Sequence, residues 1–233
     1  VGGMSRETVI GSVLAVLTGK AVPFVRPGAV SAIAKQPLAG RAPLGALGLA
    51  GDEQGDPRYH GGPHKAVHLY AFEHYARWRD EIGPRPALGH PGGFGENLST
   101  LGIDEATLCL GDQLAIGSTV LEISQGRQPC WKLNHRFEQR DMAKRLQDSG
   151  RTGWYCRVLR EGDVGAGDDI RLLARPHPEW TLARLADVFY RRGLERELLL
   201  EIARLPLVES WRQLIEKRLE SGQLEDWSRR LDG

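Results

Sequence analysis

Short apolar runs separated by glycine, proline and aspartate dominate the first three quarters of the chain. β-branched or alternating stretches recur at residues 9–17, 30–35, 66–70, 113–116, 120–124 and 169–173. Alternation of period two is typical of strands with one buried face, and short strands bounded by turn residues are typical of a barrel or sandwich. The pattern therefore predicts a mainly β domain over residues 5–175.

Two segments of this region have helical periodicity instead. Tyr75, Trp78 and Ile82 lie near one face of residues 72–82, and Gly83 and Pro84 end that run. Residues 134–146 form a second amphipathic stretch. We expect both helices to flank the strands.

The pattern changes after the proline-interrupted linker at residues 175–178. Apolar positions at helical spacing predict three short helices in a second domain, residues 176–230, the third opening at Ser210 with Gln213 as its capping-box partner. Helices of this length bury little apolar surface alone. We expect them to pack on the barrel or on a second subunit, so a homodimer is one of the two arrangements considered.

Composition narrows the range of partners. The 233 residues have a formal net charge of +1, which provides no general attraction to nucleic acid or to anionic membranes. The apolar stretch at residues 9–17 is too short to cross a bilayer. Three cysteines without a CxxC pair favour a reducing, cytoplasmic setting.

Cys130 has the most reactive surroundings of the three cysteines. In the run QGRQPCWKLNH, residues 125–135, it follows a proline and lies near Arg127, Lys132 and His135. Cationic neighbours stabilise a negatively charged sulfur, so this residue is a candidate nucleophile or soft-metal ligand. The alternative is a buried structural cysteine, which is how we interpret Cys109 and Cys156.

Two glycine-rich segments carry polar residues upstream, GDEQGDPRYHGGPHKAVH at residues 51–68 and GGFGENL at residues 92–98. The spacing of His60, His64 and His68 suggests a zinc site on a helix, but glycine and proline at positions 61–63 disfavour a helix there. An anion-binding loop formed by His60, Gly61 and Gly62 is the better interpretation, and a plain tight turn is its alternative.

The order of these motifs, together with Gly111-Asp112 and the Cys130 run, resembles the MOSC-domain family. A MOSC domain followed by three short helices is similar to the YiiM-type bacterial proteins. The resemblance implies a MOSC-type β-barrel with flanking helices, followed by a small C-terminal three-helix domain. It also implies a molybdenum cofactor of the molybdopterin type, with Cys130 as metal ligand and catalytic residue. The cofactor-binding residues that we assign are His60, Gly61, Gly62, Asn97, Arg127, Lys132, Asn134 and His135.

The resemblance further implies reduction of N-hydroxylated compounds such as hydroxylaminopurine-like bases. Electrons require a separate reductase, because the chain has neither a cysteine cluster for iron–sulfur nor a convincing Rossmann fingerprint. A non-catalytic carrier of the cofactor or of sulfur is the alternative. A hydrolytic Cys130–His135 pair is a third hypothesis, for which no third orienting group is identifiable.

Overall fold

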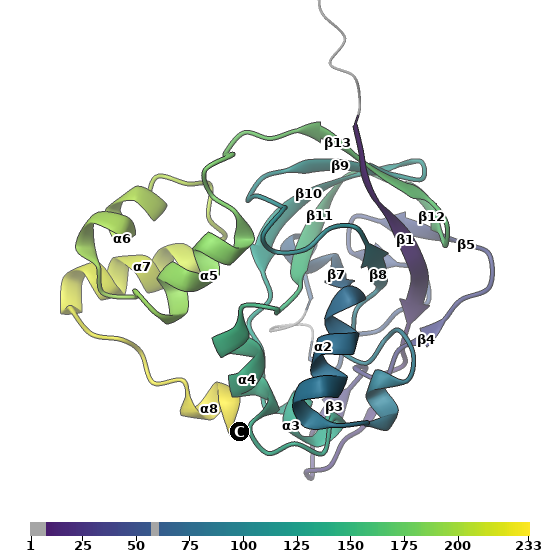
Figure 1. Ribbon diagram of the computed structural model, residues 1–233, viewed down its shortest axis with the longest axis horizontal. Coiled ribbons are helices and arrows are strands. Elements are labelled where there is room, and N and C mark those ends of the chain that lie inside the picture. The colour runs from purple at the N-terminus through teal and green to yellow at the C-terminus, as the bar shows by residue number, and fades with distance from the viewer. Residues whose placement is uncertain (1–7, 57–60) are drawn as a thin grey trace, which may run out of the picture.

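The computed structural model describes residues 8–56 and 61–233. A closed barrel of seven strands lies at its centre (Figure 1). The strands follow the order β13, β9, β10, β11, β7, β8 and β1, and antiparallel pairing of β1 with β13 closes the ring. Their bounds are β1 Thr8–Thr18, β7 Val67–Ala71, β8 Leu98–Leu101, β9 Gln113–Ile116, β10 Thr119–Gly126, β11 Trp154–Arg160 and β13 Asp169–Ala174. The mainly β domain expected from the sequence is confirmed.

Short strands extend the barrel. Antiparallel pairing places β4 on the end of β1, and β12, β5 and β6 form a small separate sheet. The strand expected at residues 30–35 is shorter than predicted, because only Val30–Ser31 pairs, with β2. The bounds are β2 Val22–Pro23, β3 Val30–Ser31, β4 Gln36–Pro37, β5 Arg41–Gly45, β6 Gly48–Leu49 and β12 Gly162–Gly165.

Helices cover one end of the barrel. The predicted helix at residues 72–82 is present as α2, but the prediction of a single helix at residues 134–146 is wrong. The segment at residues 134–146 forms two helices, because Glu138 has a φ of +50° and interrupts the helical backbone. The Phe137 carbonyl at this break accepts a hydrogen bond from Arg85 Nε at 3.0 Å. The bounds are η1 Pro63–Lys65, α2 Glu73–Ile82, η2 Pro86–Leu88, α3 Lys132–Arg136 and α4 Met142–Ser149.

The C-terminal helices share the core of the barrel. Leu185 and Trp211 belong to the same buried cluster as Leu69 and Ile123, which confirms that these helices pack on the barrel. The predicted capping box is wrong, because Val208 is the N-cap residue and Gln213 bonds to Glu209 at 2.7 Å. The bounds are α5 Leu182–Tyr190, α6 Arg196–Ile202, α7 Glu209–Ser221 and α8 Ser228–Leu231.

A second, aromatic core lies under the loops beside α2. Tyr70 and Phe94 stack with ring centroids 4.2 Å apart, and Trp78 donates a hydrogen bond to the Tyr70 hydroxyl at 2.8 Å. This packing holds the loop at residues 92–97 next to the barrel.

Within the described residues, no helix is long and apolar enough to cross a membrane.

Candidate functional site

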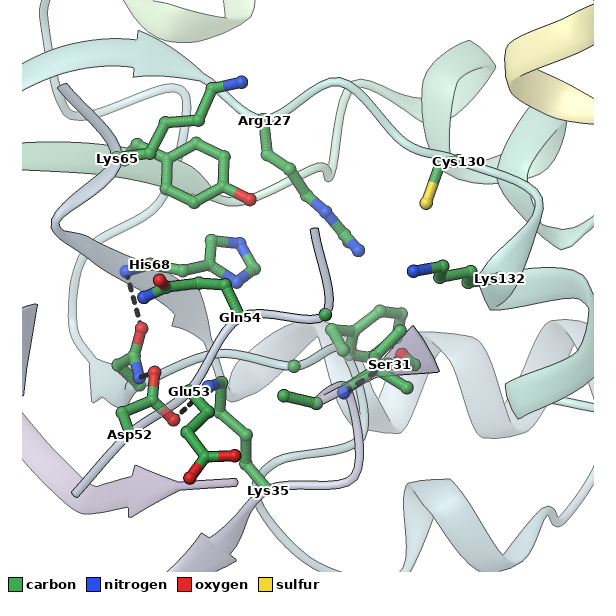
Figure 2. Close-up of a pocket in the computed structure, with 17 residues that line it drawn as sticks. Ser31, Lys35, Asp52, Glu53, Gln54, Lys65, His68, Arg127, Cys130 and Lys132 are labelled. Atoms are coloured by element: carbon green, nitrogen blue, oxygen red, sulfur yellow. Dashed lines mark hydrogen bonds and ion pairs between the residues drawn. The ribbon is translucent and has the colours of Figure 1, made fainter. Parts of the chain in front are cut away.

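A cavity lies beside the end of β10 and the start of β11 (Figure 2). Its volume is about 600 Å³, including the part open to solvent. Asn97, Arg127, Cys130 and Lys132, all proposed from the sequence, line this cavity. Tertiary folding therefore brings together residues from two motifs that are separated along the chain, at residues 92–98 and 125–135.

Cys130 lies in the loop between β10 and α3. Its thiol is half-buried, whereas Cys109 and Cys156 are buried, as predicted for core thiols. Burial raises the pKa of Cys109 and raises that of Cys156 further. Cys130 is therefore the most accessible of the three sulfur atoms.

Arg127 extends from the end of β10 into the cavity, as Figure 2 shows. Its backbone N–H donates to the Gly153 carbonyl at 2.9 Å, which fixes the start of the side chain. The residue is 7 % exposed, and its Nη1 atom has no hydrogen-bond partner in the described structure. A buried guanidinium with an unpaired nitrogen is costly unless an acceptor binds there, so Arg127 is suited to bind an anion in this cavity.

His68 on β7 also lines the cavity, and our sequence analysis did not assign it to the cofactor. The ring is buried 5.0 Å from that of Tyr155, and its Nε2 atom has no partner among the described residues. Burial, and then the charge of Arg127, lower the pKa of His68 well below the usual value, so the imidazole is neutral. Strand alternation was the available signal, because it separates His68 from the apolar Leu69.

Asn97, which we expected to bind the cofactor, is held by hydrogen bonds within the chain. Its Oδ1 atom accepts from the His68 N–H at 3.1 Å, and its Nδ2 atom donates to Asp52 Oδ2 at 2.8 Å and to the Leu17 carbonyl at 3.3 Å. Both Nδ2 hydrogens and one lone pair of Oδ1 are thus used within the chain. Asn97 lines the cavity but connects three segments of its wall.

Lys35 and Asp52 form a buried ion pair beside Asn97. Burial lowers the pKa of Lys35, and the Asp52 carboxylate opposes that shift. Asp52 also accepts from the Gly19 N–H at 2.7 Å. The pair places two charged groups in the cavity lining. Nothing in the local sequence around Lys35 indicates that Asp52 is its partner.

Glu96 organises the adjacent glycine-rich loop. The carboxylate is fully buried and accepts from the Gly92 N–H at 2.8 Å, the Phe94 N–H at 3.1 Å and the Tyr75 hydroxyl at 2.6 Å. Burial raises the pKa of Tyr75 well above its usual value. The charge of Glu96 and the hydrogen bond to its carboxylate raise this pKa further. Glu96 therefore shapes the wall that Phe94 and Gly95 contribute.

The structure describes Gly61 and Gly62 of the proposed anion-binding loop, but not His60. His60 lies outside the described residues. Gly61 and Gly62 do not line the cavity, although Gly62 has a φ of +92° and starts the turn that carries Lys65 into it. No group of three metal-ligating side chains was found among residues 8–56 and 61–233, so no histidine triad can be assigned there.

Asn134 and His135 do not line the cavity. The Asn134 side chain donates to the Leu231 carbonyl at 2.8 Å and accepts from the Ala143 N–H at 2.8 Å, so it joins α3 to α4 and to the chain end. His135 is exposed and packs edge-on against Trp131 at 5.6 Å. Both belong to the short helix α3, which follows the Cys130 loop.

Comparison with known proteins agrees with this geometry. The MOSC domain model matches residues 56–171, and the model of the YiiM-like, 3-alpha helix domain matches residues 180–222. Protein YiiM of Escherichia coli (strain K12) is 38 % identical over 223 residues, which cover 94 % of this chain and 97 % of YiiM. The chain belongs to the MOSC-domain family, in its YiiM-type branch.

Other relatives are consistent with this membership. The crystal structure of YiiM from Escherichia coli superposes with a TM-score of 0.80 at 31 % identity, covering 96 % of this chain and 99 % of that one. A protein named "Reductase" from Gibberella moniliformis (strain M3125 / FGSC 7600) is 40 % identical over 192 residues. These residues are 82 % of this chain but only 34 % of the fungal protein. A molybdenum-cofactor-related function is thus indicated by the MOSC family.

Proposed function

We propose that this YiiM-type MOSC protein is a molybdenum-cofactor-dependent reductase of N-hydroxylated compounds, in which Cys130 is the metal ligand. The observation that carries the proposal is one cavity that holds both a half-buried thiol and a buried guanidinium with an unpaired nitrogen. A thiolate is a soft ligand that suits a redox metal, and a guanidinium suits phosphate or oxo groups.

The other lining residues fit such a group. A molybdopterin carries a phosphate and a polar ring system, and Lys65, Lys132 and Arg127 place three cationic side chains around the cavity. His68 adds a neutral imidazole with an unpaired nitrogen, and burial raises the pKa of Tyr155, whose hydroxyl therefore stays protonated. The cavity thus offers cationic groups for anions and neutral hydrogen-bonding groups for a ring edge.

When bound, the cofactor would supply two-electron chemistry at the metal. Cleavage of the N–O bond of a hydroxylamine consumes two electrons and two protons and yields an amine and water. A separate reductase supplies the electrons in this proposal. The protein's own residues would hold and orient the cofactor. Cys130 would bind the metal, and Arg127 would neutralise negative charge in the cavity. The neutral side chains of His68 and Tyr155 would provide hydrogen bonds.

Cys130→Ser tests this proposal directly. In a host that makes the cofactor, we expect this variant to lose most bound molybdenum and all reduction of an N-hydroxylated purine with an artificial low-potential donor, while its melting temperature stays close to that of the wild type. Cys109→Ser is the matched control: it alters a buried thiol that is 3.5 Å from the Pro178 carbonyl, so it should lower stability and spare the metal.

Elemental analysis and chromatography of the amine product measure these outcomes. Molybdenum retained in full by the Cys130 variant would overturn the ligand assignment. Fully loaded wild-type protein that converts none of several N-hydroxylated substrates would favour the alternative, a carrier of the cofactor.

A further inference from the structure

A second hollow adjoins the cavity on the outer side of Cys130. It has a volume of about 1500 Å³, including open solvent, and shares five lining residues with the cavity: Gly55, Lys65, Cys130, Lys132 and Tyr155. Residues near the end of the chain, Arg229 and Arg230 among them, also line this hollow. Cys130 therefore lies between the barrel and the C-terminal segment.

The chain end returns to the barrel after the three-helix domain, as Figure 1 shows for α8 beside α4. Gly222, with a φ of +63°, ends α7, and Glu225 then pairs with Arg218, whose side chain is 1 % exposed, at 2.7 Å. Leu231 is buried at the other end of the segment. The returning segment lies beyond residue 222, where the YiiM-like domain match ends.

Arg230 in this segment contacts both neighbours of Cys130. Its Nη1 atom donates to the Pro129 carbonyl at 2.6 Å, and its own carbonyl accepts from the Trp131 N–H at 2.8 Å. Its Nη2 atom donates to Gln147 Oε1 on α4 at 2.5 Å, which anchors the guanidinium. The peptide groups before and after Cys130 are thus both tied to one residue about a hundred positions away.

We propose that Arg230 is a positioning residue for Cys130, and that the C-terminal segment is a working part of the site. Residues 127–130 lie in no helix or strand, so the direction of the sulfur depends on contacts made by the flanking peptides. Arg230 supplies such contacts on both sides. What the positioned sulfur does rests on the proposed function, but the positioning itself does not.

Alkylation of the three thiols in the cofactor-free, full-length protein tests this assignment. Iodoacetamide is added at neutral pH, and mass spectrometry of peptides follows each cysteine separately in the wild type, Arg230→Ala and Arg230→Lys. Arg192→Ala is the control, because Arg192 is an exposed arginine of the same domain that pairs with Glu195.

We expect Arg230→Ala to change the alkylation rate of Cys130 by at least about threefold, because a charge-assisted hydrogen bond that restrains the loop is lost. Cys109 and Cys156 should keep their slow rates, Arg230→Lys should recover most of the wild-type rate, and Arg192→Ala should match the wild type. In molybdenum-loaded preparations, Arg230→Ala should retain less metal for the same amount of folded protein.

Two results would overturn the assignment. An unchanged Cys130 rate in Arg230→Ala would show that the contacts do not position the thiol. An equal rise at all three cysteines would show a general loss of stability. A wild-type protein that binds no molybdenum would refute the proposed function. The alkylation experiment would still test the positioning role of Arg230, because alkylation needs no cofactor.

Discussion

Replacing Arg127 with glutamine should have opposite effects on cofactor retention and on the stability of the cofactor-free fold. The guanidinium is 7 % exposed and its Nη1 atom is unpaired within the described structure. An unsatisfied buried polar group costs about 1–3 kcal/mol of folding free energy. Glutamine removes the buried charge, so the cofactor-free variant should be as stable as the wild type or up to about 2 kcal/mol more stable.

Cofactor retention should weaken in the same variant. A hydrogen bond from a charged donor contributes about 1.5–3 kcal/mol, and about 1.4 kcal/mol corresponds to a tenfold change in affinity. Loss of one such contact therefore predicts retention that is weaker by about 10- to 150-fold. The free energy of unfolding in urea and the molybdenum content after dialysis measure the two effects in parallel.

Arg157→Gln is the matched control. Arg157 lies on β11 and pairs with Glu122 through its Nε atom at 2.8 Å, with a side chain that is 27 % exposed. Its replacement should cost about 1 kcal/mol or less and leave molybdenum content unchanged. If Arg127→Gln instead lowers stability while retaining its cofactor, Arg127 is a structural residue and the anion site is refuted.

Two further variants test the wall of the cavity. The pKa of His68 is lower in the folded state than in the unfolded chain. As pH falls below about 6.5, the unfolded chain therefore binds a proton at His68 before the folded protein does. The free energy of unfolding then decreases by up to about 1.4 kcal/mol per pH unit. Urea unfolding at two pH values should show a smaller acid-induced loss in His68→Gln; an identical loss would mean that His68 does not remain neutral. Glu96→Gln should cost about 2–3 kcal/mol, because the amide keeps a single acceptor oxygen and cannot serve both Gly92 and Tyr75 at Oε1 and Phe94 at Oε2. An unchanged urea midpoint would contradict this role.

Local patterns predicted five of the seven barrel strands, β1, β7, β9, β10 and β13, but neither β8 nor β11. They also predicted the helices α2, α5, α6 and α7. Residues 113–116 alternate and form β9 with the same bounds, and the apolar stretch at residues 9–17 falls within β1. Both signals work because burial of one strand face requires a period of two. The helix at residues 134–146 was mispredicted because the backbone leaves the helical conformation at Glu138, next to a Phe137 carbonyl that accepts from Arg85 of a distant loop.

The sequence by itself determined which chemistry is present: a cysteine after a proline, with arginine and lysine nearby, in a chain of almost neutral charge. Tertiary structure alone decided which of these groups meet. Asn134 and His135 are close to Cys130 in sequence but do not line the cavity, whereas Lys35 and His68 reach it from distant segments. The physical reason is that a side chain's direction follows from backbone hydrogen bonds and packing between segments, and the return of the chain end to the Cys130 loop depends on such contacts.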